Sequence, residues 1–101
     1  MNGREWRWRR SGLRQFQVVR CVVTGHRGRF GVDVSLVEPN AKVPAFIDFV
    51  HLTDGPEHLA PADFPPVGRL LDAVTLDFMP DGELRLSARP SAVAGERAED
   101  P

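Results

Sequence analysis

Arginine and tryptophan are interleaved at the start of this chain, in a combination that suits contact with phosphates and bases. Eight of the thirteen basic residues precede Phe30 with one acid among them, whereas five cations and thirteen acids lie from Phe30 onward. The eight are Arg4, Arg7, Arg9, Arg10, Arg14, Arg20, Arg27 and Arg29. The resulting charge of +7, against −8 for the remainder, attracts phosphate, and Trp6 and Trp8 suit stacking on unpaired bases. The pattern predicts a basic end that binds a polyanion, or else a solvated, poorly ordered terminus.

The remaining residues with chemical potential form no catalytic or metal-binding pattern. The spacing of the single cysteine and the three histidines matches no zinc motif. These residues are Cys21, His26, His51 and His58. Scattered aspartates are typical of a solvated surface, and no nucleophile elbow, phosphate loop or Ser–His–Asp order is present. We therefore expect no enzymatic activity, no metal and no cofactor.

The bulk composition favours one small domain. A chain of 101 residues can bury a modest core, and 9 prolines with 9 glycines indicate many turns rather than long helices. No window contains the roughly 20 apolar residues of a membrane span, and a lone cysteine excludes an intramolecular disulfide. We expect a cytoplasmic monomer that contacts no membrane.

Five segments have the composition of β-strands or the alternation of apolar and polar residues that is typical of them. These segments must position the basic and aromatic residues described above. They are residues 15–24, 30–36, 43–50, 69–78 and 82–89. In the second, Phe30, Val32, Val34 and Leu36 share one face. In the third, period two predicts Ile47 and Phe49 inside and Phe46 partly exposed beside Asp48.

The connections between these segments complete the expected architecture. Residues 80–82 (Pro-Asp-Gly) predict a hairpin turn, and the four prolines within residues 52–68 leave room for one short helix at most. We expect Phe64 in that connector to close one end of a barrel. The whole pattern predicts an all-β, five-stranded OB-fold barrel over residues 14–90, with an SH3-like barrel as the alternative. Residues 1–13 are predicted to form a flexible basic arm, and residues 91–101 a disordered acidic tail.

The order of motifs resembles the S1 domain, the OB-fold RNA-binding module of ribosomal protein S1 and polynucleotide phosphorylase. Four segments carry the resemblance: Gly28-x-Phe30, the Ala-Phe-Ile-Asp-Phe run of residues 45–49, Val67-Gly68, and the Leu-Arg-Leu-Ser-Ala-Arg run of residues 84–89. It covers roughly residues 15–91 and implies an RNA-binding face on the barrel.

The resemblance also implies which residues form that face. Phe30 matches an RNA-stacking aromatic, Arg27 takes the place of another, and Arg85 matches a basic position. Asp48 stands where the family has a histidine, and Glu83 stands where it has a basic residue. Two carboxylates at these positions oppose the electrostatic attraction that dominates binding to nucleic acid.

These observations lead to two functional hypotheses. The first is a non-catalytic module for RNA or single-stranded nucleic acid, with stacking on Phe30 and Phe46 and the basic arm adding charge. Its phosphate contacts are expected from Arg20, Arg27, Arg29 and Arg85. For Phe30, packing in the core is the competing interpretation. The second hypothesis is a protein-interaction adaptor for a basic partner, on a barrel whose RNA face has been lost.

Overall fold

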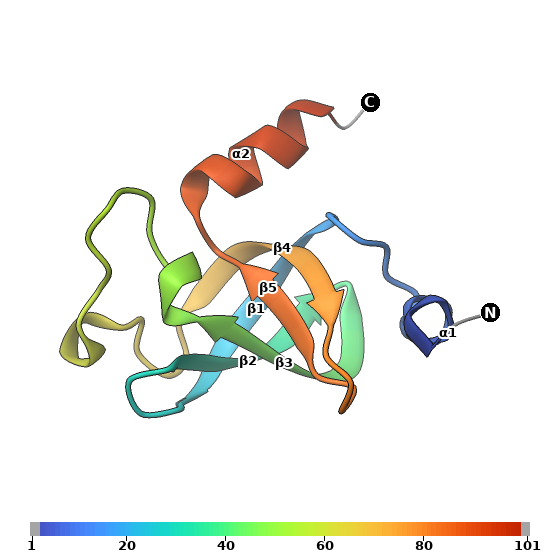
Figure 1. The fold of residues 1–101 in the computed structure, drawn as a ribbon, viewed down its shortest axis with the longest axis horizontal. Helices are drawn as coiled ribbons and strands as arrows, with labels where there is room; N and C mark the ends of the chain where they lie inside the picture. The colour runs from blue at the N-terminus through green and yellow to red at the C-terminus, as the bar shows by residue number, and fades with distance from the viewer. Residues whose placement is uncertain (1–2, 100–101) are drawn as a thin grey trace.

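The structure is a computed structural model that describes residues 3–99, and its central feature is a β-barrel with a helix at each end of the chain (Figure 1). The strands are β1 (Val18–His26), β2 (Gly31–Glu38), β3 (Asn40–Asp48), β4 (Leu70–Phe78) and β5 (Leu84–Ser87). The helices are α1 (Gly3–Ser11) and α2 (Pro90–Glu99), with short 3-10 turns η1 (Phe49–His51) and η2 (Pro61–Asp63) between β3 and β4.

The strand order confirms the predicted OB barrel. The strands follow one another as β1-β2-β3-β5-β4, and pairing of β1 with β4 closes the circle. All pairs are antiparallel except β3 and β5, which are parallel. The predicted hairpin joins β4 to β5, where Gly82 has φ +94° and donates its N–H to the carbonyl of Met79.

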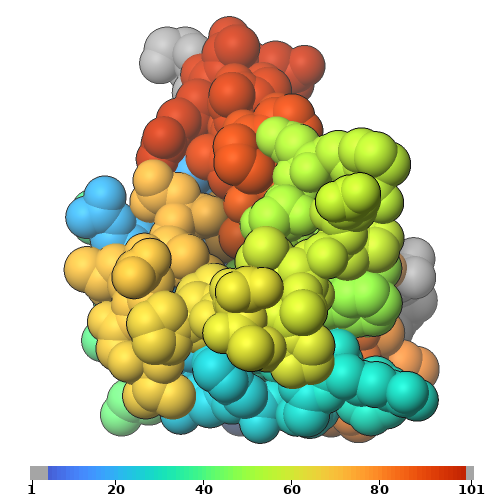
Figure 2. Space-filling model, turned by 90° about the vertical axis from the view of Figure 1, so that its left-hand side faces the viewer, coloured from blue at the N-terminus to red at the C-terminus, as the bar shows by residue number. Residues whose placement is uncertain are grey.

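Alternating residues of every strand fill the barrel. Val32, Val34 and Leu36 point inward as predicted, and Cys21 of β1 is fully buried beside them. Phe64, from the proline-rich connector, is buried in the same cluster as expected. Figure 2 shows the connector spread over this end of the barrel, between α2 and the β1–β2 turn.

The predicted arm is helical in the structure from Gly3 to Ser11, and it contacts the barrel. The ring of Trp8 meets Phe78 edge-on at 4.7 Å between centroids, and Leu13 is buried in the core. Gly12, at φ +75°, ends the helix and donates to the carbonyl of Arg9. Because so few apolar side chains attach α1 to the barrel, its sequence shows no helical periodicity of apolar residues. Residues 1–2 of the predicted arm lie outside the described residues.

The predicted disordered tail likewise forms a helix, α2. Val93 is buried against the barrel, Arg97 binds Asp72 of β4 at 2.9 Å, and Asp54 accepts hydrogen bonds from the backbone and the hydroxyl of Ser91. Asp54 thus satisfies a free N–H in the first turn of the helix. Residues 100–101 of the predicted tail lie outside the described part of the chain.

The structure also bears on membrane insertion and on metal binding. No helix within residues 3–99 has the length and apolar character needed to cross a membrane. Over the same residues, no cluster of three or more His, Cys, Asp or Glu side chains is arranged to hold a metal ion.

Candidate nucleic-acid interface

The aromatic ring of Phe46 lies on the outside of the barrel, yet it is buried. Phe46 is opposite Asp33 of β2 and Arg85 of β5 in the strand register. Its side chain is only 2% exposed, because the guanidinium carbons of Arg27 and Arg85 lie 4.0 and 4.8 Å from its ring centroid. The predicted partial exposure of Phe46 was therefore wrong. Ile47 points into the core as predicted, whereas Phe49 begins η1 and is only partly buried against the core.

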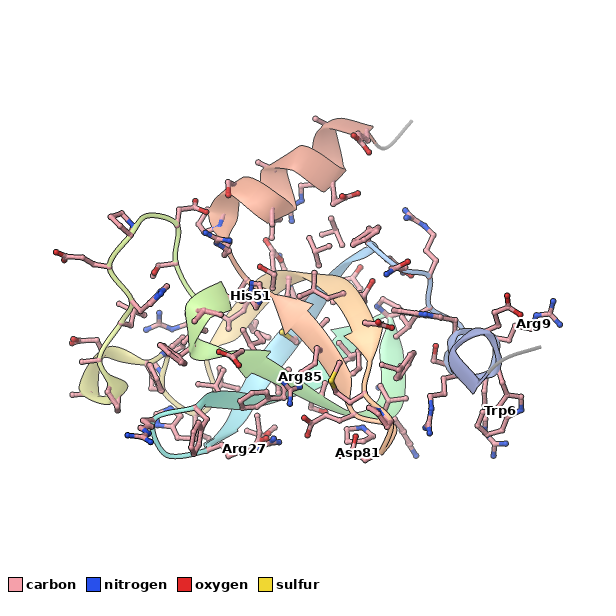
Figure 3. All side chains as sticks on the ribbon, in the orientation of Figure 1. Trp6, Arg9, Arg27, His51, Asp81 and Arg85 are labelled. Carbon is pink, nitrogen blue, oxygen red and sulfur yellow. The ribbon has the colours of Figure 1, made fainter. Side chains whose placement is uncertain are left out.

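Ion pairs hold both arginines over this ring. Arg27 binds Asp33 and also Glu83, with 2.7 Å between its Nη2 and Oε2 of Glu83. Arg85 binds the other oxygen of Glu83 through Nε at 3.1 Å, and its Nη1 lies 4.0 Å from Oδ2 of Asp48. We call this group the Phe46 cluster: Arg27, Asp33, Phe46, Asp48, Glu83 and Arg85. Figure 3 shows Arg27 and Arg85 on this side of the barrel.

The electrostatics of the Phe46 cluster favour its closed arrangement. The hydrogen bond from Arg27 is the main reason that the pKa of Glu83 lies below its usual value. The same bond raises the pKa of Arg27, with a smaller contribution from Asp33. Because three carboxylates surround two guanidinium groups, Arg27 and Arg85 are already paired before any phosphate arrives.

Gly31 makes this packing possible. A Cβ atom on Gly31 would lie 2.1 Å from the carbonyl oxygen of Ile47 and 2.9 Å from Cζ of Phe46. The residue also has a backbone φ of +146°, which residues other than glycine rarely adopt. The glycine therefore lets β2 and β3 approach closely beneath the Phe46 ring.

Phe30 and Arg29 form an open site at the β1–β2 turn. Phe30 is 56% exposed, so the interpretation as a core residue does not apply. The guanidinium carbon of Arg29 lies 5.4 Å from its ring centroid, and among the described residues no carboxylate pairs with Arg29. The backbone of Phe30 is fixed by bonds to Arg27 and Phe49, which hold the ring outward.

Arg20 lies apart from the other predicted contacts. It is on β1, a strand that pairs with neither β3 nor β5. Its Nε is 3.4 Å from Asp72, which also binds Arg97. The hydrogen bond from Arg97, followed by that from Arg20, lowers the pKa of Asp72. The structure therefore brings Arg27, Phe46 and Arg85 together, places Phe30 and Arg29 at the adjoining turn, and separates Arg20.

The sequence predicts the basic arm, but not the groove that this arm forms with the barrel. Among the side chains that the structure describes, no ion pair involves Arg7, Arg9, Arg10, Arg29, Lys42 or Arg69. Three of them, Arg7, Arg10 and Lys42, line one groove between α1 and the barrel. Lys42 follows the strand alternation that places Phe46 outside, which is the signal that would have identified it.

Comparison with known proteins identifies the fold but no sequence family. No protein-family model matches the chain, and no curated protein sequence matches it. A solved structure of an a/eIF2alpha–aDim2p–rRNA complex from Pyrococcus horikoshii OT3 is similar, with TM-score 0.66 and 18% identity. That match covers 85% of this chain and 50% of the other.

Two further solved structures are similar over most of the chain. GSP13 from Bacillus subtilis matches with TM-score 0.62 and 21% identity, covering 88% of this chain and 65% of GSP13. A Streptococcus pneumoniae TIGR4 multidomain protein with nucleic acid binding domains matches with TM-score 0.57 and 27% identity, over 75% of this chain and 23% of that protein. This chain thus spans less than two thirds of the length of each. The shared barrel, with β1 closing on β4 and β3 parallel to β5, is the S1-like OB fold.

Proposed function

We propose that this chain is a non-catalytic module that binds RNA or another single-stranded nucleic acid through its barrel face and the basic α1. The observation that carries this proposal is the presence of two exposed aromatic–arginine pairs, Phe30 with Arg29 and Trp6 with Arg10. Each offers a π-face for a base and a cation, unpaired among the described residues, for a phosphate. The rRNA complex and the protein with nucleic acid binding domains, both similar in fold, support the same class of ligand.

The Phe46 cluster has a different role in this proposal from the one that the sequence predicts. Arg27 and Arg85 are engaged by carboxylates, so they contribute little to phosphate binding. The Arg27 side chain is still 42% exposed above the Phe46 ring, and a guanidinium plane can stack on a base. Phe30 and Arg27 then provide neighbouring stacking surfaces, and Arg29 supplies the phosphate contact. Arg20, paired with Asp72, adds only long-range charge.

A salt series with fluorescently labelled single-stranded RNA tests the proposal. Fluorescence anisotropy should show a log-linear fall of affinity with salt, since each phosphate contact contributes a slope of about −0.7. Phe30→Ala should weaken binding about fivefold or more by removing a stacking surface, while Arg69→Gln, a change of one exposed cation, should have a smaller effect. Absence of binding at low salt would overturn the proposal.

A protein-interaction adaptor is the second candidate. Leu70 and Val67 are 54% and 63% exposed, and Leu70 lies beside Leu71 and Val93 in a groove between β4 and α2. Apolar anchors of this kind are typical of protein interfaces. Binding through them should depend weakly on salt and should be reduced by Leu70→Ser, which is expected to leave RNA affinity unchanged.

A further inference from the structure

The groove between α1 and the barrel combines positive charge with aromatic surface. It has a volume of about 550 Å³ and is bordered by α1, β3, the end of β4 and the β4–β5 turn. Its principal lining residues are Trp6, Arg7, Arg10, Lys42, Phe78 and Gly82. Three of these side chains are cations, and no described acid lines the groove. Such a site favours an anion that also carries a flat apolar group.

Contacts with the β4–β5 turn position the Arg7 side chain in the groove. Its Nη2 donates a hydrogen bond to the carbonyl of Pro80 at 2.9 Å. A Cβ on Gly82 would lie 2.5 Å from Nη1 of Arg7, so the glycine leaves the space that this guanidinium occupies. One carbonyl uses only part of the donor capacity of an arginine, and the remaining donors are available to a phosphate.

The helix that forms one wall is fastened to the barrel. Trp8 packs edge-on against Phe78, and Leu13 is buried just beyond the helix. The hydroxyl of Ser11 donates to the carbonyl of Trp8 and accepts from the N–H of Leu13, which fixes the exit from α1. The groove therefore exists before any ligand binds, and binding costs little ordering of the helix.

Trp6 supplies the aromatic surface. Its side chain is on the same helix as Trp8 but is 50% exposed, and the guanidinium carbon of Arg10 lies 5.1 Å from its ring centroid. Figure 3 shows Trp6 beside α1, on the side of the molecule far from Arg27. A large exposed indole beside cations is suited to stacking on a base.

We propose that this groove binds one nucleotide of a single-stranded RNA, with its phosphate on Arg7, Arg10 and Lys42 and its base on Trp6. The inference rests on the proposed function and specifies how its Trp6–Arg10 pair would bind, with Arg7 and Lys42 as further phosphate contacts. A strand that contacts both this groove and the Phe30–Arg29 site would pass the Phe46 cluster between them.

A pair of charge-matched variants tests the site. Arg10→Gln/Lys42→Gln removes two groove cations, whereas Arg9→Gln/Arg69→Gln removes two unpaired cations that do not line the groove. Anisotropy titrations with the labelled RNA should show the salt slope reduced by about 1.4 in the groove variant, since each lost phosphate contact removes about 0.7. The control variant should reduce the slope by clearly less, because its two cations lie outside the groove.

The outcomes separate the site from the general function. Equal losses in both variants would overturn the groove as a binding site but leave RNA binding standing. Failure of the unmodified protein to bind RNA would overturn both proposals. Trp6→Ala should further weaken binding about fivefold or more while Trp6→Phe restores it, because stacking needs only an aromatic face. Circular dichroism of all variants should match the unmodified protein, and an unchanged affinity for Trp6→Ala would exclude base stacking on Trp6.

Discussion

The Phe46 cluster and the α1 groove are built from the same residue types and have opposite character. Both place guanidinium groups against an aromatic ring, at 4.0 and 4.8 Å for Phe46 and 5.1 Å for Trp6. The ring is 2% exposed in the first case and 50% exposed in the second. The difference shows that an aromatic ring beside arginine can be covered or left open, and that neighbouring carboxylates decide which by holding the guanidinium groups in place.

Strand pairing explains why carboxylates gather in one place and not the other. Register aligns Asp33 with Phe46 across β2 and β3, and Glu83 precedes β5, so two acids border the ring. On α1, Glu5 is the one acid in a nine-residue helix that carries four arginines. Strand pairing in a sheet therefore brings together charged residues that are far apart in the sequence. The charge of a short helix, in contrast, is set by its own residues.

The largest expected effect comes from closing the space beneath the Phe46 cluster. Gly31→Ala should destabilise the protein by about 4 kcal/mol or more, because a backbone clash and strained φ add together. Urea denaturation measures this change. Gly55→Ala is the matched control, since φ is also positive there but no atom lies within 4 Å of the added Cβ. A similar loss for both would mean that φ alone, rather than the close approach to Phe46, constrains Gly31.

A smaller loss is expected from detaching α1. Leu13→Ala removes a buried side chain where α1 joins β1 and should cost about 2–3 kcal/mol in the free energy of unfolding. Hydrogen exchange should show faster exchange at the amides of residues 5–13, because the helix loses part of its anchor. Unchanged exchange there would show that Trp8 and Arg7 are sufficient, and the groove would remain formed.

The smallest stability effect should come from opening the Phe46 cluster itself. Arg27→Ala leaves the Glu83 side chain, which is 14% exposed, without its main partner, and should cost about 1–2 kcal/mol at neutral pH. The pKa of Glu83 is lowered in the folded protein, so its stabilisation is complete above the ordinary value of 4.5 and is lost as the pH falls through the folded value.

The difference in the free energy of unfolding between the unmodified protein and Arg27→Ala should therefore shrink on acidification. Urea denaturation at pH 7 and pH 3 would measure it, and Arg29→Ala, which removes a cation without an ion pair, should change stability by no more than about 0.5 kcal/mol at either pH. A difference that persists at pH 3 would assign the effect to lost packing of Arg27 on Phe46 rather than to charge.

Much of the barrel was predictable because its signals are local. Alternation placed Val32, Val34 and Leu36 in the core, and Pro80 with Gly82 marked the hairpin. Phe46 was misjudged because period two determines which side of a strand a residue occupies, not what covers that side. Its cover comes from Arg27 and Arg85, which lie 19 and 39 positions away in the sequence.

The two helices were unpredictable for a related reason. Each is fixed to the barrel by few apolar side chains, chiefly the partly buried Trp8 for α1 and the buried Val93 for α2, so no apolar stripe appears in either sequence. Their other attachments are long-range bonds, from Arg7 to Pro80 for α1, and from Arg97 to Asp72 and Ser91 to Asp54 for α2. The basic character of the first segment was evident from composition, but the groove needed the fold to bring Lys42 beside it.

The buried thiol of Cys21 has a consequence for the reactivity of the whole chain. Burial, with a further contribution from the charge of Asp72, raises its pKa to about 12. Thiolates, not thiols, attack disulfides and electrophiles, so this cysteine is inert at neutral pH. As it is the one cysteine in the sequence, alkylating reagents and oxidised glutathione should leave the folded chain unmodified. Any cysteine introduced on the surface would be the single reactive sulfur for attaching a probe.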